Sequence, residues 1–272
     1  MPELPEVETV RRLLEPAMRD ARFRRVILNR PNLRIPFPAR FIERLRGRTA
    51  DAIERRGKYL VITLSSGETL IMHLGMSGWF HVAPIGDRAR EADAHDHVVF
   101  IMSSGQAVTF NDPRRFGFMD LAMAGQAGDY PSLKAMGPEP LSPAFDAASL
   151  ARACRGRKAS IKVTLLDQRV VAGLGNIYAS EALHHARLSP LRSAGSLATS
   201  TGKPRKQAVQ LVASIKAVLA AAIRRSESPY RAGRFRVYER AEEACLRKGC
   251  AGTIKQFTQG GRSTYYCPIC QK

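Results

Sequence analysis

Four of the five cysteines of this chain lie close together, between positions 245 and 270, with the spacing Cys245-x4-Cys250-x16-Cys267-x2-Cys270. Two close pairs separated by a longer insert are typical of a tetrahedral zinc site with four thiolate ligands. The insert, TIKQFTQ-GGR-STYY, has two alternating runs around a Gly-Gly turn, which predicts a β-hairpin zinc finger. Because four cysteines leave no coordination position for water, we expect one structural Zn²⁺ and no catalytic role for it. The alternative, four reduced thiols in a disordered tail, is opposed by the paired strand pattern.

The first residues, MPELPEVETVRR, contain two prolines and three glutamates within eight positions. The simpler interpretation is a helix whose first turn is acidic, which complements the helix dipole. The alternative interpretation is that the end of the chain takes part in chemistry. Composition does not decide between these two.

A third group of residues surrounds the turn GLG at 173–175. Asn176 opens the helix that follows, where its side chain can cap and the first-turn N–H groups can bind an anion. Lys158 and Lys162 precede the turn, and Arg262 occupies the tip of the predicted zinc hairpin. A glycine turn between helices is a weak signal alone, but basic residues on both sides favour binding of a nucleic-acid backbone.

The overall charge also favours binding to a nucleic acid. The 272 residues carry a formal net charge of +19, which favours nucleic acid first and an anionic membrane second as partner. We see neither a secretory signal nor an apolar run of the ~18–20 residues that span a bilayer. The richest apolar run, 213–223, is interrupted by Lys216. We therefore expect a soluble intracellular protein, in which clustered cysteines bind metal and do not form disulfides.

The predicted secondary structure that positions these groups changes along the chain from strands to helices. Short β-branched runs dominate the first half and predict a sandwich or barrel: KYLVITL (58–64), TLIMHL (69–74), VVFIM (98–102) and AVTFND (107–112). Val7, Val10 and Leu14 share one face of a short helix that Pro16 helps to end. The polar segment 84–96 reads as a loop.

Helical periodicity follows the Pro-rich stretch MGPEPLSP (136–143). We predict helices over 160–168 and from 176 to 188, and a longer one with an apolar stripe of Val209, Val212, Ile215, Leu219 and Ile223. The expected domains are residues 1–135, a linker at 136–145, a helical nucleic-acid-binding domain at 146–233 and the zinc finger at 234–272. The fold class is thus α+β and multidomain.

Several longer motifs give the chain a family resemblance. They are MPELPEVETVRR, GKYL (57–60), MHLGMSG (72–78), HDH (95–97), NDPRRFG (111–117), GPEPL (137–141), GLGNIYASEAL (173–183) and GRSTYYCPICQK at the end. Together they cover essentially the whole chain, which resembles the bacterial formamidopyrimidine-DNA glycosylase (Fpg or MutM) family. The resemblance implies an N-terminal β-sandwich flanked by helices, a helix-two-turn-helix domain and a C-terminal zinc finger. It favours this branch over the Nei relatives, which act mainly on oxidised pyrimidines.

By this resemblance, removal of methionine exposes the secondary amine of Pro2 as a nucleophile that forms a Schiff base with the sugar. An α-amino group titrates near ~7.7–8.0 and is partly neutral at physiological pH, as a nucleophile must be. Glu3 would serve as acid and base at the sugar ring, and Glu6 would support the amine. Lys58 would assist β-elimination and Arg262 δ-elimination. Without the resemblance, helix-dipole effects would explain both glutamates, and Lys58 would read as a solvated lysine at a strand end.

A base inside the stack must be everted before it can react. The resemblance assigns the filling of the vacated space to Met76, Arg114 and Phe116. It assigns further DNA contacts to His73, His95, Lys158, Lys162 and Asn176. Core packing is the usual fate of methionine and phenylalanine, although the polar setting of NDPRRFG opposes it for Phe116.

Two departures from the family pattern stand out. The first cysteine pair is C-x4-C where many members have C-x2-C, and both spacings can close a tetrahedral site. The segment SESPYRAGRFRVYER (226–240) replaces a longer, Gly-rich loop that folds over the everted purine, so recognition of 8-oxoguanine is in question.

We therefore expect a monomeric base-excision-repair enzyme, a DNA glycosylase and AP lyase, that acts on damaged double-stranded DNA in the bacterial cytoplasm and binds no membrane. Its expected substrates are formamidopyrimidines and 8-oxoguanine. A Nei-like enzyme that prefers oxidised pyrimidines or abasic sites is one alternative. A non-catalytic zinc-finger DNA-binding protein is another, and the presence of Pro2, Glu3 and Lys58 argues against it.

Overall fold

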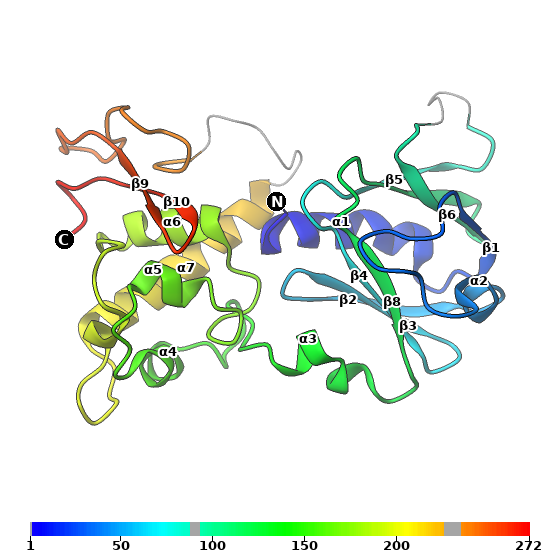
Figure 1. Ribbon diagram of the computed structural model, residues 1–272, viewed down its shortest axis with the longest axis horizontal. Coiled ribbons are helices and arrows are strands. Elements are labelled where there is room, and N and C mark those ends of the chain that lie inside the picture. Colours follow the sequence, from blue (N-terminus) through cyan, green and yellow to red (C-terminus); the bar gives the residue numbers. More distant parts are fainter. Residues whose placement is uncertain (1, 88–92, 226–234) are drawn as a thin grey trace. The chain divides into compact units, whose positions relative to one another are not determined.

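The computed structural model describes residues 2–87, 93–225 and 235–272 (Figure 1). They form two compact units. The first unit comprises Pro2 and residues 6–134, and the second comprises Glu3–Pro5 and Ala135–Lys272. The second unit therefore contains both the helical region and the cysteine-rich end of the chain.

The first unit is built on two four-stranded sheets whose paired strands are all antiparallel. One sheet has the order β1 (Phe23–Leu28), β6 (Asp96–Met102), β7 (Gln106–Asn111), β5 (Trp79–Pro84). The other has the order β2 (Ala50–Arg56), β3 (Tyr59–Leu64), β4 (Thr69–His73), β8 (Phe118–Ala122). Alternate side chains of β3 are buried, and they share one hydrophobic core with side chains of the other sheet, as in a β-sandwich.

Helix α1 (Leu4–Met18) contributes Val7, Val10 and Leu14 to this core, as their spacing predicts. The helix begins at Leu4, with Glu6 in its first turn. The expectation that Pro16 helps to end it was wrong, because it continues through Pro16 to Met18. Because Ala17 and Met18 are buried in the core, their packing stabilises the last turn although Pro16 removes one backbone donor.

Four strands were not predicted: β1, β2, β5 and β8. Strand β2 reads ADAIERR, in which acidic and basic residues obscure the alternation, and only Ala50 and Ile53 are buried. Its extended form comes from pairing with β3, a case in which tertiary context overrides local propensity. Three short helical segments complete the first unit: α2 (Phe41–Leu45), η1 (Ala127–Asp129) and α3 (Pro131–Lys134).

The second unit has a helical core and a β-hairpin. Its helical elements are α4 (Ala147–Cys154), α5 (Ile161–Leu165), α6 (Asn176–His185), η2 (Ala194–Leu197) and α7 (Lys206–Arg225). The hairpin consists of β9 (Lys255–Gln259) and β10 (Arg262–Tyr266). As predicted, Gly260 and Gly261 form the turn, and both have the positive φ that glycine adopts without strain.

Helix α7 has the length and hydropathy that would allow a helix to cross a membrane. Most of its predicted stripe is buried in the core of the second unit, however, together with Leu211 of the same helix. Val209, in the first turn of the helix, is the exception, because it is 55% exposed. The burial of this stripe is what a core helix of a globular unit shows.

Candidate functional site

The carboxylate of Glu3 is held at the start of α6. It accepts hydrogen bonds from the backbone N–H groups of Gly175 (2.9 Å), Ile177 (2.8 Å) and Tyr178 (3.3 Å), and its residue is only 2% exposed. The first N–H groups of a helix have no partner within the helix and carry its positive dipole end. The anion that the sequence predicted at this turn is therefore, in this structure, a side chain of the protein itself.

Asn176 was expected to cap α6, and this was wrong. Gly175 occupies the N-cap position, and the side-chain amide of Asn176 donates to the carbonyl oxygen of Ser263 at 2.9 Å. Lys162 is fully buried, and its ammonium donates to the same carbonyl (2.9 Å) and to the hydroxyl of Thr264 (2.7 Å). Both side chains therefore hold the start of β10 in place.

Arg262, the residue just before this anchored segment, is exposed at the hairpin turn. Burial, together with the charge of Arg262, lowers the pKa of Lys162 to about 8, although Glu3 partly opposes the shift. An anion that neutralised the Arg262 charge would therefore also favour the charged form of Lys162.

A groove of about 410 Å³ lies beside the hairpin turn and is lined by Arg262, Arg157 and Arg169, among others. Asp167 pairs with Arg169 at 2.9 Å and with Arg157 at 3.3 Å. The hydrogen bond from Arg169 is the main cause that lowers the pKa of Asp167 to about 2. Because three guanidinium groups and one carboxylate line the groove, its excess of positive charge suits a phosphate. The predicted contact Lys158 is exposed, directly after Arg157 in the chain.

In the first unit, His73 ends β4 between two aromatic rings. Its ring stacks on Phe118 (5.6 Å between centroids) and packs against Tyr59 (4.9 Å). The N–H of Gly75 donates to Nδ1 at 3.0 Å. Burial, with the charges of Lys58 and Arg34, lowers the pKa of His73 to about 4. Because Nδ1 accepts this hydrogen bond, the neutral imidazole carries its proton on Nε2. With a pKa this low the ring stays neutral near pH 7, so Nε2 remains a hydrogen-bond donor there.

Met76 and Phe116 do not belong to the core. They are 38% and 42% exposed and lie on the loops after β4 and β7. The exposed guanidinium of Arg114 sits 5.0 Å from the centre of the Phe116 ring, a cation–π contact that pairs the two side chains. The core-packing alternative is therefore wrong for both residues, and all three predicted wedge residues are presented at the surface.

The other predicted residues of the first unit divide by burial. Lys58, in the turn between β2 and β3, is 8% exposed, so it is not the solvated lysine that local sequence suggested. The side chain of Arg55 braces this turn, donating to the carbonyl oxygen of Gly57 at 3.0 Å. Pro2 and Glu6 are buried, whereas His95 is exposed just before β6.

Glu181 is a buried residue whose role the sequence did not reveal. Its carboxylate accepts hydrogen bonds from the backbone N–H groups of Arg236, Val237 and Tyr238 at 2.8–3.0 Å. It thus orders the segment that leads to the cysteines, as Glu3 does for the start of α6. The motif GLGNIYASEAL contains Glu181, but nothing in the local pattern pointed to a partner 55 positions away.

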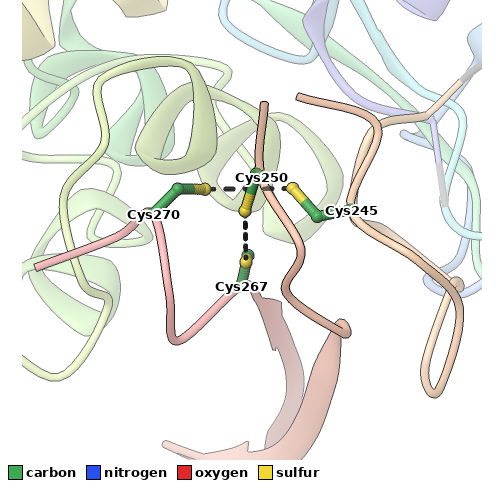
Figure 2. A group of neighbouring side chains, drawn as sticks. All are labelled: Cys245, Cys250, Cys267 and Cys270. Carbon is green, nitrogen blue, oxygen red and sulfur yellow. Dashed lines mark hydrogen bonds between the residues drawn. The ribbon is translucent and has the colours of Figure 1, made fainter. Parts of the chain in front are cut away.

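The four clustered cysteines converge on one point (Figure 2). Their sulfurs all lie within 4.8 Å of one another, with Cys245 to Cys270 at 3.9 Å and Cys250 to Cys267 at 3.6 Å. Sulfurs at the corners of a tetrahedron with Zn–S bonds of ~2.3 Å are about 3.8 Å apart, so the residues fit a zinc ion. The imidazole Nε2 of His184 lies 3.4 Å from the Cys245 sulfur, a contact suited to orienting a thiolate ligand.

Two family models match the chain: the formamidopyrimidine-DNA glycosylase N-terminal domain over residues 1–119 and the H2TH domain of the same glycosylase over residues 136–232. The chain is 53% identical to the formamidopyrimidine-DNA glycosylase of Rhodopseudomonas palustris strain BisA53 over 293 positions, and 50% identical to that of Afipia carboxidovorans over 294. Both alignments cover the whole of each chain. The first has 21 more positions than the 272 residues of this chain, so the relative carries residues that are absent here.

Solved structures of enzymes from this family are similar to the chain as well. The Lactococcus lactis enzyme, non-covalently bound to DNA with an AP site, has a TM-score of 0.87 at 32% identity, covering all of both chains. MutM from Thermus thermophilus has a TM-score of 0.83 at 36% identity, covering 99% of this chain and 98% of that one.

Proposed function

The chain belongs to the formamidopyrimidine-DNA glycosylase family, and from that membership we propose that it excises oxidised purines from duplex DNA and then cleaves the strand. The observation that carries the proposal most directly is the anchored Glu3. Its buried carboxylate, fixed by three backbone N–H groups, immediately follows the proline that would act as nucleophile. A helix cap alone does not require an N-terminal position for that carboxylate.

The proposed chemistry begins once Met1, which lies outside the described residues, has been removed. The neutral amine of Pro2 forms a bond to C1′ of the damaged nucleotide, and the bond from C1′ to the base breaks, with its electron pair leaving on the base. Opening of the sugar ring gives an iminium ion. This cation acidifies the C2′ proton, so loss of that proton expels the 3′-phosphate, and a second elimination expels the 5′-phosphate.

The protein residues supply the proton transfers. Glu3 acts as acid and base at the sugar ring, while Glu6 supports the amine and its protonation state. Lys58 assists β-elimination, consistent with its burial in a braced turn. Arg262 assists δ-elimination from a hairpin that Lys162 and Asn176 hold in place.

Recognition of DNA uses separate groups. Met76 and Phe116 fill the space left by the everted nucleotide, and Arg114 hydrogen-bonds the orphaned base, which suits their exposure on two loops. His73, His95 and Lys158 contact phosphates. The contacts of Lys162 and Asn176 support an indirect role for these two, through the position of Arg262.

The four cysteines hold one structural Zn²⁺ in this proposal, and the ion stabilises the hairpin without taking part in the reaction. The protein would act as a monomer on the chromosomal DNA of the bacterial cytoplasm.

The lesion preference depends on the short segment at 226–240, of which residues 226–234 lie outside the described residues. The additional positions in the relative's alignment are consistent with a missing loop. We propose that formamidopyrimidines and abasic sites are better substrates than 8-oxoguanine. Excision rates should be measured on duplexes with 8-oxoguanine opposite each base, formamidopyrimidine, an abasic site or an oxidised pyrimidine. A clear preference for the oxidised pyrimidine would favour the Nei-like alternative.

Borohydride trapping tests the covalent chemistry. The wild type should cross-link to lesion duplexes, because borohydride reduces the iminium to a stable amine. Pro2→Gly, which leaves only a primary amine without the proline ring, should lose most of the product. Intact-mass measurement should first establish that Met1 is absent. A wild type that traps neither lesion nor abasic DNA would rule out the enzymatic proposal.

Binding to DNA should depend steeply on salt. Because each neutralised phosphate releases condensed counterions, about six phosphate contacts predict a loss of roughly 10³-fold in affinity between 50 and 200 mM salt. The basic groove around Arg262 and the charge of +19 supply such contacts. Fluorescence anisotropy on an undamaged duplex measures the slope, and Lys158→Ala should reduce it by about one contact. A flat salt dependence would exclude phosphate binding as the main source of affinity.

A further inference from the structure

Asp112 is a fully buried carboxylate at the end of β7, in the motif NDPRRFG. The hydroxyl of Ser77 donates to Oδ1 at 2.5 Å, and the backbone N–H of Gly117 donates to Oδ2 at 2.8 Å. Ser77 lies on the loop after β4, and Gly117 closes the loop after β7. One side chain therefore joins the loop that carries Met76 to the loop that carries Phe116.

Ser77 completes the bridge. Its oxygen also accepts the backbone N–H of Arg114 at 3.2 Å, so the serine connects the Met76 loop directly to the segment that presents Arg114. The Asp112 carboxylate and the Ser77 hydroxyl thus fix the backbone immediately beside each of the three proposed wedge residues.

The two loops also approach each other without room for side chains. A Cβ atom on Gly75 would lie 2.3 Å from the backbone N of Gly117, and Gly75 has a φ of +64°. A Cβ on Gly117 would lie 2.7 Å from the ring of Phe110. Backbones packed this closely leave the loops little freedom to separate while the Asp112 bridge is intact.

A third loop is attached to the same residue. The backbone N–H of Asp112 donates to the carbonyl oxygen of His95 at 3.0 Å. Nε2 of the buried His97 lies 2.9 Å from the Asp112 carbonyl, to which it donates. The segment that presents His95, another proposed DNA contact, is therefore tied to the main chain of Asp112, while the wedge loops are tied to its side chain.

We propose that Asp112 is a positioning residue, which with Ser77 holds the loops bearing Met76, Arg114 and Phe116 in one arrangement before DNA arrives. This inference rests on the proposed function of those three side chains. Side chains that are already held in place lose less conformational entropy when they enter the base stack. The free-energy cost of everting the nucleotide is therefore lower. Asp112 itself contacts neither the sugar nor the base in this account.

The inference predicts a separation between substrates that need eversion and substrates that do not. Ser77→Ala removes the bridge with little change in volume. Asp112→Ala removes the hydrogen bonds that the Asp112 carboxylate accepts from Ser77 and Gly117. Both should slow excision from a lesion duplex by on the order of 10- to 100-fold in single-turnover assays. Borohydride trapping on an abasic site in a single-stranded oligonucleotide, where no base pair is opened, should stay within about twofold of the wild type.

Asp112→Asn keeps the shape and one acceptor, so its loss should be smaller than that of Asp112→Ala. Ser104→Ala is a matched control, because that serine donates to the carbonyl oxygen of Ala17 (2.6 Å) from the β6–β7 turn, at the other end of these strands. It should leave both substrates unaffected. Equal losses on duplex and single-stranded substrates in Ser77→Ala would overturn the inference, even if Asp112→Ala fails to fold.

A readout without chemistry separates this inference from the proposed function. A 2-aminopurine placed beside the lesion should brighten on binding of the wild type, because unstacking relieves its quenching, and should brighten much less with Ser77→Ala. That result would support the positioning role even if borohydride trapped nothing. Equal brightening with Ser77→Ala and the wild type would refute it.

Discussion

Replacing Glu3 with glutamine is expected to slow base excision by about 10²- to 10⁴-fold, the range typical of a lost general acid or base. The amide has nearly the shape of the carboxylate but cannot act as a general acid or base at neutral pH. It also presents an NH₂ group to backbone donors at one of the two oxygen positions, which leaves at least one N–H among those of Gly175, Ile177 and Tyr178 without an acceptor. Single-turnover excision from a formamidopyrimidine duplex measures the rate.

The same variant should retain much of its trapping on abasic DNA. An abasic site already presents an aldehyde, with which Pro2 can condense without displacing a base, so the step assigned to Glu3 is bypassed. We also expect the melting temperature to fall by a few degrees, because the start of α6 loses part of its anchor. Glu242→Gln, at an exposed glutamate whose ion pair within the described part of the chain is with Lys255 at 3.2 Å, should change neither the excision rate nor the melting temperature. A lower melting temperature with undiminished excision would show that Glu3 acts as a helix cap and not as an acid or base.

The sequence predicted the fold best where the local pattern and the tertiary environment agree. Strands β3, β4, β6 and β7 alternate or run continuously in β-branched residues, and all four were found close to their expected bounds. The cysteine hairpin was predicted within two residues because metal spacing and turn chemistry are both local. Strand β2 was not predicted, because its acidic and basic residues obscure the alternation and its extended form comes from pairing with β3.

The candidate site could be predicted in parts but not as an assembly. Both an acidic chain end and an anion-binding helix start at GLG were visible in the sequence, yet 172 positions separate the donor Gly175 from the acceptor Glu3. Lys162 and Asn176 were predicted to contact DNA, and the structure shows in addition that both donate to the carbonyl oxygen of Ser263 at the start of β10, 101 and 87 positions further on. Contacts of this range leave no local signature, so charge and spacing alone did not reveal these internal partners.

The four-cysteine cluster supports the second large prediction, that Cys267→Ser abolishes zinc retention and lowers lesion-DNA affinity by at least about 10²-fold. Structural zinc contributes roughly 10–16 kcal/mol of apparent binding free energy in isolated zinc fingers. The local core here is small, consisting of Val237, Cys245, Ile254, Tyr265 and Cys267. Without the ion the hairpin should unfold, which would displace Arg262 and leave the buried ammonium of Lys162 without its partners in β10. Elemental analysis and anisotropy measure the two effects.

The fifth cysteine provides the matched control. Cys154 is buried in the helical core of the second unit, away from the four-cysteine cluster, and burial raises the pKa of its thiol to about 11. Its thiol therefore stays protonated and does not bind metal at neutral pH. Cys154→Ser should keep one zinc per chain and near-normal DNA affinity, with only a modest loss of stability. If Cys267→Ser also kept its zinc and its affinity, Cys267 would not be a required ligand and the four-cysteine assignment would be wrong. If the zinc were lost but the affinity kept, Arg262 would not be the contact through which the hairpin binds DNA.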